Sequence, residues 1–184
     1  MKLYFSPTSP FVRKCRIVAH EHGVTLDLVR TRILDTDDGQ PNPLLMVPSL
    51  ELDDGSFVAD SRVICHVLSA GAPRSLQDRV LEAVADGLCD RVVARTLAQR
   101  GEARYFDPAR EARRLRAIRG TLDHLDAQER APGFGIGDAA LVATLTYFDL
   151  RHSDLDWREG RANLADWLET QTGRDSVVAT EYAP

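Results

Sequence analysis

The stretch VPSLELDDGSFVADSRVI, residues 47–64, carries the clearest structural signals in this 184-residue chain. Asp54-Gly55 separates two short apolar runs, which predicts a β-hairpin with a type I′ turn, because both residues accept the positive φ that this turn requires. Asp60 or Ser61 is predicted to cap a following helix. The inner face of that helix is predicted to hold Val63, Ile64, Val67 and Leu68.

The residues before this stretch predict a strand, a helix and a second strand. Leu3 to Phe5 is a short apolar run that indicates a buried strand. Pro10 suits the first turn of a helix, since its missing N–H has no intrahelical partner there, and Gly23 supplies a stop. Thr25 to Val29 alternates and predicts the next strand. Residues 1–70 are therefore predicted to form a compact α/β domain.

The chain beyond the short linker 71–75 has helical periodicity throughout. The segment from Ala139 to Leu150 is apolar on nearly every side, which is typical of a helix buried by its neighbours. Residues 76–184 are therefore predicted to form an all-helical domain. The other helical stripes are Leu81, Val84, Ala85, Leu88 and Val92, then Leu115, Ile118, Leu122 and Leu125, and finally Leu164, Trp167 and Leu168.

Composition excludes several classes of partner. The net charge is −5, and the arginines between residues 110 and 119 have acidic neighbours, so we expect no nucleic acid or anionic membrane as partner. The sequence contains no run of about 18 apolar residues, so no membrane span is predicted. Three widely spaced cysteines without a C-x-x-C pair argue against disulfides and zinc and favour a reducing cytoplasm. They are expected to be buried small hydrophobes. His20 and His22 face different ways on a helix, so we expect no metal there.

Four segments, taken in order, resemble the soluble glutathione transferase superfamily, and the resemblance covers nearly the whole chain. They are residues 6–14, 42–50, 53–64 and 137–141. The resemblance is closest to bacterial members with a serine-type active site. It implies a thioredoxin-like glutathione-binding domain over residues 1–70 and an all-α helical domain over residues 76–184. It also implies glutathione as co-substrate, a small hydrophobic electrophile, a detoxification role and a homodimer.

The resemblance assigns glutathione contacts to two places in residues 47–64. It implies that Pro48 is cis and that the backbone of Val47 pairs with the cysteinyl part of glutathione, as an added strand would. The alternative is that Pro48 begins a strand in trans. The Ser61 hydroxyl and N–H would hold the γ-glutamyl carboxylate at a helix N-terminus, with Asp60 near the amino group. The alternative role of both residues is plain capping, and the two roles are compatible.

Ser9 is the candidate catalytic residue. Glutathione needs its thiol, whose pKa is about 8.5 when free, to ionise near neutral pH. A hydroxyl donating to the thiolate at the start of a helix promotes this ionisation. Ser9-Pro10-Phe11 resembles the serine-type motif of the family, which implies that Ser9 and Phe11 contact glutathione. Ser6 and Thr8 are alternatives for the same role.

Two features depart from the family pattern. Leu45-Met46 stands where members commonly carry a polar pair that helps hold the glycyl end of glutathione. Gly135 stands three residues before Asp138, where the family usually has Ser or Thr completing a reciprocal helix cap. Glycine is a tolerable N-cap.

The resemblance predicts conjugation of glutathione thiolate to small hydrophobic electrophiles, with Arg95 and Tyr105 as candidate pocket residues. A non-catalytic binding or scaffold protein of the same fold is the alternative that Leu45-Met46 favours. A glutathione-dependent isomerase or dehalogenase is a weaker alternative, because residues 6–9 do not match the Ser-Ser-Cys type of isomerase motif.

Overall fold

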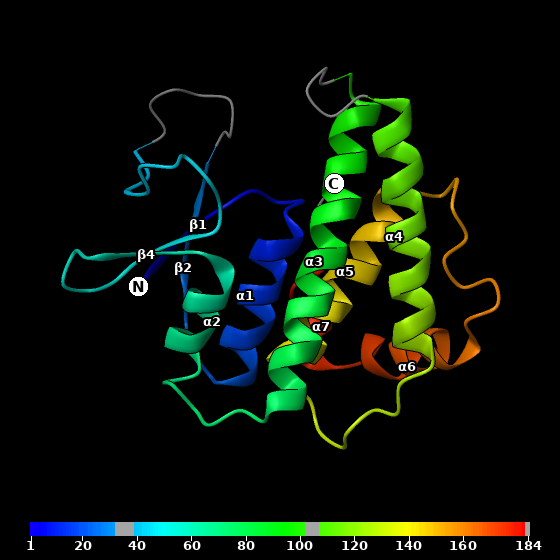
Figure 1. Cartoon of the computed structure of the whole chain (residues 1–184). Helices are drawn as coiled ribbons and strands as arrows, with labels where there is room; N and C mark the ends of the chain where they lie inside the picture. Colours follow the sequence, from blue (N-terminus) through cyan, green and yellow to red (C-terminus); the bar gives the residue numbers. More distant parts are fainter. Residues whose placement is uncertain (32–38, 102–106, 183–184) are drawn as a thin grey trace. The chain divides into compact units, whose positions relative to one another are not determined.

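The computed structural model describes residues 1–31, 39–101 and 107–182, which divide into two compact units. The first unit comprises Met1–Ser75 and Arg174–Pro184, and the second comprises Leu76–Gly173. The first unit contains a small sheet with helices, and the second is helical, as the sequence predicted (Figure 1). None of the helices in the described ranges is both long and apolar enough to cross a membrane.

The sheet of the first unit has four strands in the order β2-β1-β3-β4. β1 pairs in parallel with β2 and antiparallel with β3, and β3 pairs antiparallel with β4. This mixed sheet is the arrangement expected from a strand–helix–strand unit followed by a hairpin and a helix. The strands are β1 (Lys2–Phe5), β2 (Asp27–Arg30), β3 (Ser49–Glu51) and β4 (Phe57–Ala59).

The hairpin between β3 and β4 is confirmed, but the predicted type I′ turn is wrong. Such a turn needs positive φ at both central residues, whereas only Gly55 has it, at φ 83°. The Gly55 N–H donates to Leu52 O at 3.0 Å, and the Leu52 N–H donates to Ser56 O at 2.8 Å. The connection is thus a longer loop that ends on a left-handed glycine. Asp54 stabilises it by accepting from the Ser56 N–H at 2.9 Å.

Two helices of the first unit, α1 (Pro10–Glu21) and α2 (Ser61–Leu68), pack against each other beside the sheet (Figure 1). Cys15 and Cys65 are completely buried where these helices meet, with their Sγ atoms 3.9 Å apart. Cys89 of the second unit is buried as well. The prediction that the cysteines are buried apolar groups is confirmed. Val63 is a correction, because it is 49% exposed, and Cys65 takes its place on the inner face.

The C-terminal segment 174–182 differs from the expected domain division, because it packs with the first unit. It contains α7 (Asp175–Val178), and three residues of α1 bind it. Arg13 donates to Val177 O at 3.1 Å, and Arg16 donates to Ala179 O at 3.2 Å. Glu21 accepts from the Ser176 hydroxyl and pairs with Arg174. Hydrophobic periodicity in the sequence does not predict these contacts, because each joins residues more than 150 positions apart.

The helical unit is built around α5, whose residues from Ala139 to Leu145 are all buried, as predicted. The prediction extended to Leu150, which is 42% exposed, so the last turn of α5 is not buried on every side. α5 packs most extensively on α3, and α4 runs beside α3 (Figure 1). The leucines and isoleucine predicted for the α4 stripe are buried, apart from the half-buried Leu115. The helices are α3 (Leu76–Gln99), α4 (Pro108–Asp126), α5 (Ile136–Arg151) and α6 (Ala162–Thr172).

The start of α5 is capped by a residue from another helix. Asp138 accepts from the N–H of Gly135 at 2.8 Å, which is half of the reciprocal cap. The other half comes from Asp78 of α3, whose carboxylate accepts from the Gly137 N–H at 2.8 Å. A Cβ on Gly135 would lie 2.4 Å from Asp78 Oδ1. Glycine at position 135 therefore leaves room for the carboxylate that replaces the missing hydroxyl.

We predict that Gly135→Ser lowers the free energy of unfolding by about 1–2 kcal/mol, although serine is ordinarily the better N-cap. The added Cβ must displace Asp78 and break its bond to Gly137. In an Asp78→Ala background the same substitution should be neutral or stabilising. Urea unfolding of the two single variants and the double variant tests this, and additive losses would contradict it.

Candidate functional site

The strand register brings three of the predicted segments to one end of the strands in the sheet. Tyr4, near the end of β1, pairs with Ser49, and Ser49 pairs in turn with Ala59. The turn before α1 follows β1, residues 47–48 precede β3, and α2 follows β4. All three segments therefore join the sheet at the same end of its strands. The N-termini of α1 and α2 both begin there, and Cys15 Sγ lies 3.8 Å from Ser61 O beneath them.

Ser9 is the N-cap of α1. Its Oγ accepts from the Val12 N–H at 3.4 Å, and its own N–H donates to Ser6 O at 3.1 Å. Pro7 in the intervening turn and Pro10 in the first helical turn favour this geometry. The hydroxyl accepts in the cap, so its proton is free to be donated to an anion in front of the helix. Ser6, Thr8 and Phe11 are half-buried at the same place.

The Val47-Pro48 bond is cis, as the family resemblance implied. Val47 is half-buried, and its N–H and C=O make no hydrogen bond to the described part of the chain. β3 begins only at Ser49, so the Val47 backbone lies just beyond the ladder. These two groups are available to an extended peptide.

Asp60 and Ser61 form the start of α2. Asp60 is the N-cap and accepts from the Arg62 N–H at 2.8 Å, while Ser61 is 8% exposed. Asp60 has φ 70° and ψ 126°, a backbone conformation that residues with a side chain rarely adopt. A strained residue at a helix start that faces open space is typical of a binding site. No sequence signal predicted this strain.

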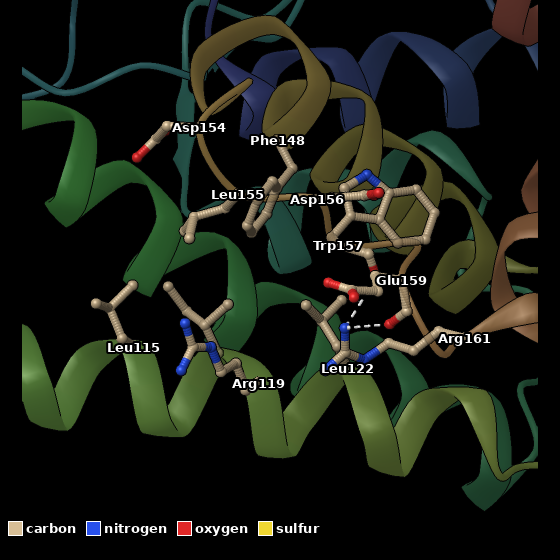
Figure 2. A pocket seen from close by; sticks show the side chains of 11 residues that line it. Leu115, Arg119, Leu122, Phe148, Asp154, Leu155, Asp156, Trp157, Glu159 and Arg161 are labelled. Carbon is tan, nitrogen blue, oxygen red and sulfur yellow. Dashed lines mark hydrogen bonds between the residues drawn. The ribbon is translucent and has the colours of Figure 1, made fainter.

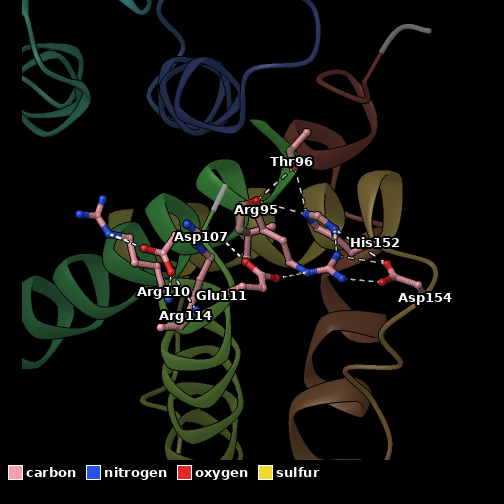
Figure 3. A network of polar contacts seen from close by, with 10 residues as sticks. Arg95, Thr96, Asp107, Arg110, Glu111, Arg114, His152 and Asp154 are labelled. Carbon is pink, nitrogen blue, oxygen red and sulfur yellow. Dashed lines mark hydrogen bonds and ion pairs between the residues drawn. The ribbon is translucent and has the colours of Figure 1, made fainter. Parts of the chain in front are cut away.

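The candidate pocket residue Arg95 lies in a network of polar side chains in the helical unit (Figure 3). Its guanidinium donates to Glu111 at 3.1 Å and to Asp154 at 2.5 Å, and its side chain is only 9% exposed. Glu111 also pairs with Arg114. Arg95 thus joins α3 to α4 and to the segment after α5. Its assignment to a substrate pocket stays a prediction, and Tyr105 lies outside the described residues.

His152 occupies the buried side of this network. Its Nδ1 lies 2.5 Å from Arg95 Nη1, which can only donate, so Nδ1 must accept. Nε2 then carries the proton and lies 3.0 Å from Thr96 Oγ1 and 3.2 Å from Val92 O. Burial lowers the pKa of His152 below its ordinary value of 6.5, and the positive charge of Arg95 adds to this effect. The Arg95 guanidinium in turn holds the pKa of Asp154 below its ordinary value.

A cavity of about 320 Å³ adjoins the network, between α4 and the segment that follows α5 (Figure 2). Its floor is apolar and its rim is charged. Arg161 on the rim is held by Asp123 and by the carbonyls of Trp157 and Glu159. The residues that line the cavity are Leu115, Ile118, Arg119, Leu122, Phe148, Asp154, Leu155, Asp156, Trp157, Glu159 and Arg161. None of the predicted site residues is among them.

The part of the chain that the structure describes contains no group of three or more His, Cys, Asp or Glu side chains that could hold a metal ion.

Comparison with known proteins finds a family match in each half of the chain. Residues 3–75 match the family described as glutathione S-transferase, N-terminal domain, and residues 107–170 match its C-terminal domain. The uncharacterised GST-like protein YibF of Escherichia coli K12 is 32% identical over 98% of both chains.

Solved structures agree with this comparison. A glutathione S-transferase of Methylobacillus flagellatus, crystallised with glutathione bound, is 30% identical over 99% of both chains, with a TM-score of 0.90. A glutathione transferase family member from Pseudomonas fluorescens, with bound S-(propanoic acid)-glutathione, is 31% identical over the full length of both chains, with a TM-score of 0.88.

We predict that Asp60→Gly raises the free energy of unfolding by about 1 kcal/mol, because glycine adopts the positive φ without strain and is nearly as good an N-cap. Asp60→Ala is the matched control. It removes the carboxylate but keeps the strain, and so should destabilise the protein. Urea unfolding measures both, and equal losses in the two variants would show that residue 60 stores no backbone strain.

We predict that stability falls as the pH drops below 6.5. The unfolded chain then takes up a proton at His152 that the folded chain, with its lowered pKa, does not. The loss should not exceed about 1.4 kcal/mol per pH unit and should level off at the folded pKa. His152→Asn keeps an acceptor for Arg95 but cannot titrate. The difference between the two unfolding profiles from pH 7.5 to 5 isolates His152, and identical profiles would refute the prediction.

Proposed function

The chain belongs to the glutathione S-transferase family, and from this premise we propose that it conjugates glutathione to small hydrophobic electrophiles. The observation that supports this most directly is the end of the sheet where α1 and α2 begin and where the Val47 backbone has no hydrogen bond to the described residues. Glutathione is a peptide with anionic groups. An unpaired backbone can hold its peptide part, and helix N-termini favour its anions.

In the proposed complex, the cysteinyl residue of glutathione pairs with the N–H and C=O of Val47, beside Pro48. The γ-glutamyl carboxylate binds the N–H and hydroxyl of Ser61, and the Asp60 carboxylate pairs with the γ-glutamyl ammonium group. The glutathione and glutathione conjugate bound by the two solved relatives support this class of ligand. Phe11, half-buried in the first turn of α1, lies beside the peptide.

The proposed catalytic residue is Ser9. Its hydroxyl donates a hydrogen bond to the glutathione sulfur and stabilises the thiolate, and the N-terminus of α1 adds a favourable field. The thiolate attacks an electrophilic carbon, and the leaving group departs with the electron pair of the broken bond. The proton of the thiol has by then passed to solvent.

A non-catalytic binding protein of the same fold is the second candidate, and the segment before Val47 favours it. The side chains of Leu45 and Met46 are 49% and 62% exposed and offer no polar contact to the glycyl carboxylate. Retention on glutathione resin without conjugation of a chlorodinitrobenzene would establish this alternative. Absence of both would exclude glutathione as the ligand.

The assembly and location follow the family pattern in this proposal. We propose a homodimer in the reducing cytoplasm, where the three buried thiols stay reduced. Light scattering after size-exclusion chromatography tests the dimer.

We predict that Ser9→Ala lowers kcat/KM for a chlorodinitrobenzene at pH 6.5 by roughly 10- to 100-fold, while the Kd for glutathione changes far less. The reason is that the pKa of the bound thiol returns towards its free value. Ultraviolet absorbance of the bound thiolate against pH measures this directly.

Ser6→Ala and Thr8→Ala are the matched controls, since each removes a half-buried hydroxyl from the same turn. Both should keep the wild-type thiol pKa. A raised thiol pKa in either control, with Ser9→Ala unaffected, would move the catalytic role to that residue.

A further inference from the structure

The loop before Val47 is organised by one buried amide. Asn42 is 2% exposed. Its Nδ2 donates to Met46 O at 2.9 Å, and its Oδ1 accepts from the Leu44 N–H at 3.0 Å. Its backbone C=O accepts from the Leu45 N–H at 2.9 Å, which closes a turn. Asn followed by Pro is a favoured opening for such a turn. Asn42 therefore spans the loop from its start to the residue that precedes Val47.

Within residues 44–46, the side chains give the loop little apolar anchoring. The side chains of Leu44, Leu45 and Met46 are all largely exposed, from 49% to 69%. Leu45 also has φ 52°, which is unfavourable for a residue with a branched side chain. A strained turn with few apolar contacts depends on its hydrogen bonds to keep its shape. Three such bonds within residues 42–46 converge on Asn42.

The bond to Met46 O has a direct consequence for Val47. Met46 C=O and Val47 N–H belong to one planar peptide group, and in a trans peptide they point in opposite directions. When Asn42 Nδ2 holds the carbonyl on the inner side of the loop, the Val47 N–H must point outward, away from Asn42. That N–H has no hydrogen bond to the described residues.

We propose that Asn42 is a positioning residue that aims the Val47 N–H at the cysteinyl carbonyl of glutathione. This inference rests on the proposed binding of glutathione. Asn42 does not touch the ligand itself. It fixes the plane of the peptide that does, and so removes the cost of orienting that peptide when glutathione binds.

Asn42→Asp is the sharpest test, because it changes one atom. At pH 8, which favours the ionised carboxylate over a protonated carboxyl group that could donate, the new oxygen cannot donate to Met46 O, while the other oxygen still accepts from the Leu44 N–H. We expect the Kd and the KM for glutathione to rise at least about tenfold, with kcat at saturating glutathione unchanged. In ¹H–¹⁵N spectra, the shift of the Val47 amide on adding glutathione should be lost or much reduced.

Two control variants separate positioning from general stability. Leu44→Ala removes an exposed side chain but keeps the backbone that Asn42 binds, so its Kd should stay within about twofold of wild type. Glu21→Gln weakens contacts to Ser176 and Arg174 in the same unit. It should lower the melting temperature without changing the Kd or the Val47 amide shift.

The outcomes are distinct. Wild-type affinity in Asn42→Asp overturns the inference and leaves the proposed function standing. So does a Kd that rises in Glu21→Gln in proportion to lost stability, because Asn42 would then be merely structural. A wild-type protein that fails to bind glutathione at millimolar concentration overturns the proposed function, and this inference with it.

Discussion

The pairing of Tyr4 with Ser49 and of Ser49 with Ala59 is the constraint on which the candidate site depends. A shift of one residue in either pair would turn the side chains of a whole strand to the other face of the sheet. It would also move residues 47–48 relative to the starts of α1 and α2. Burial of Leu3 and Leu50, both completely inaccessible, opposes such a shift. The same apolar contacts that stabilise the first unit therefore also align three segments of the site.

Much of the fold was predictable because its signals are local. The ends of helices and strands are marked by residues whose backbone preferences need no partner, such as Pro10, Gly23 and Asp54-Gly55. The burial of α5 is indicated by its apolar composition. The failures have non-local causes. The turn type follows from how β3 and β4 meet, and the exposure of Val63 follows from which face α2 turns to α1. The position of residues 174–182 follows from contacts with Arg13, Arg16 and Glu21, which hydrophobic periodicity in the sequence does not predict.

The candidate site shows the same division. Ser9, Val47, Asp60 and Ser61 stand beside a proline or at a helix start, where sequence carries information about backbone geometry. Asn42 was part of a matching segment, but nothing in the sequence indicated that its amide reaches Met46. Arg95 was predicted as a substrate-pocket residue, whereas its partners on α4 and beyond α5 are visible only in the folded chain (Figure 3). The Arg95 and His152 sides of this network are buried, whereas the Asp154 side chain is 52% exposed.

The cap of α5 by Asp78 has a consequence for how the helical unit forms. A helix that carries its own N-cap hydroxyl can begin to form before it meets any other helix. With Gly135 in that place, α5 obtains its second cap only from α3, across 59 residues of sequence. An excised α5 peptide is thus expected to be less helical than one with serine at the cap. Ordering of the central helix becomes coupled to its docking, which makes the helical unit more cooperative.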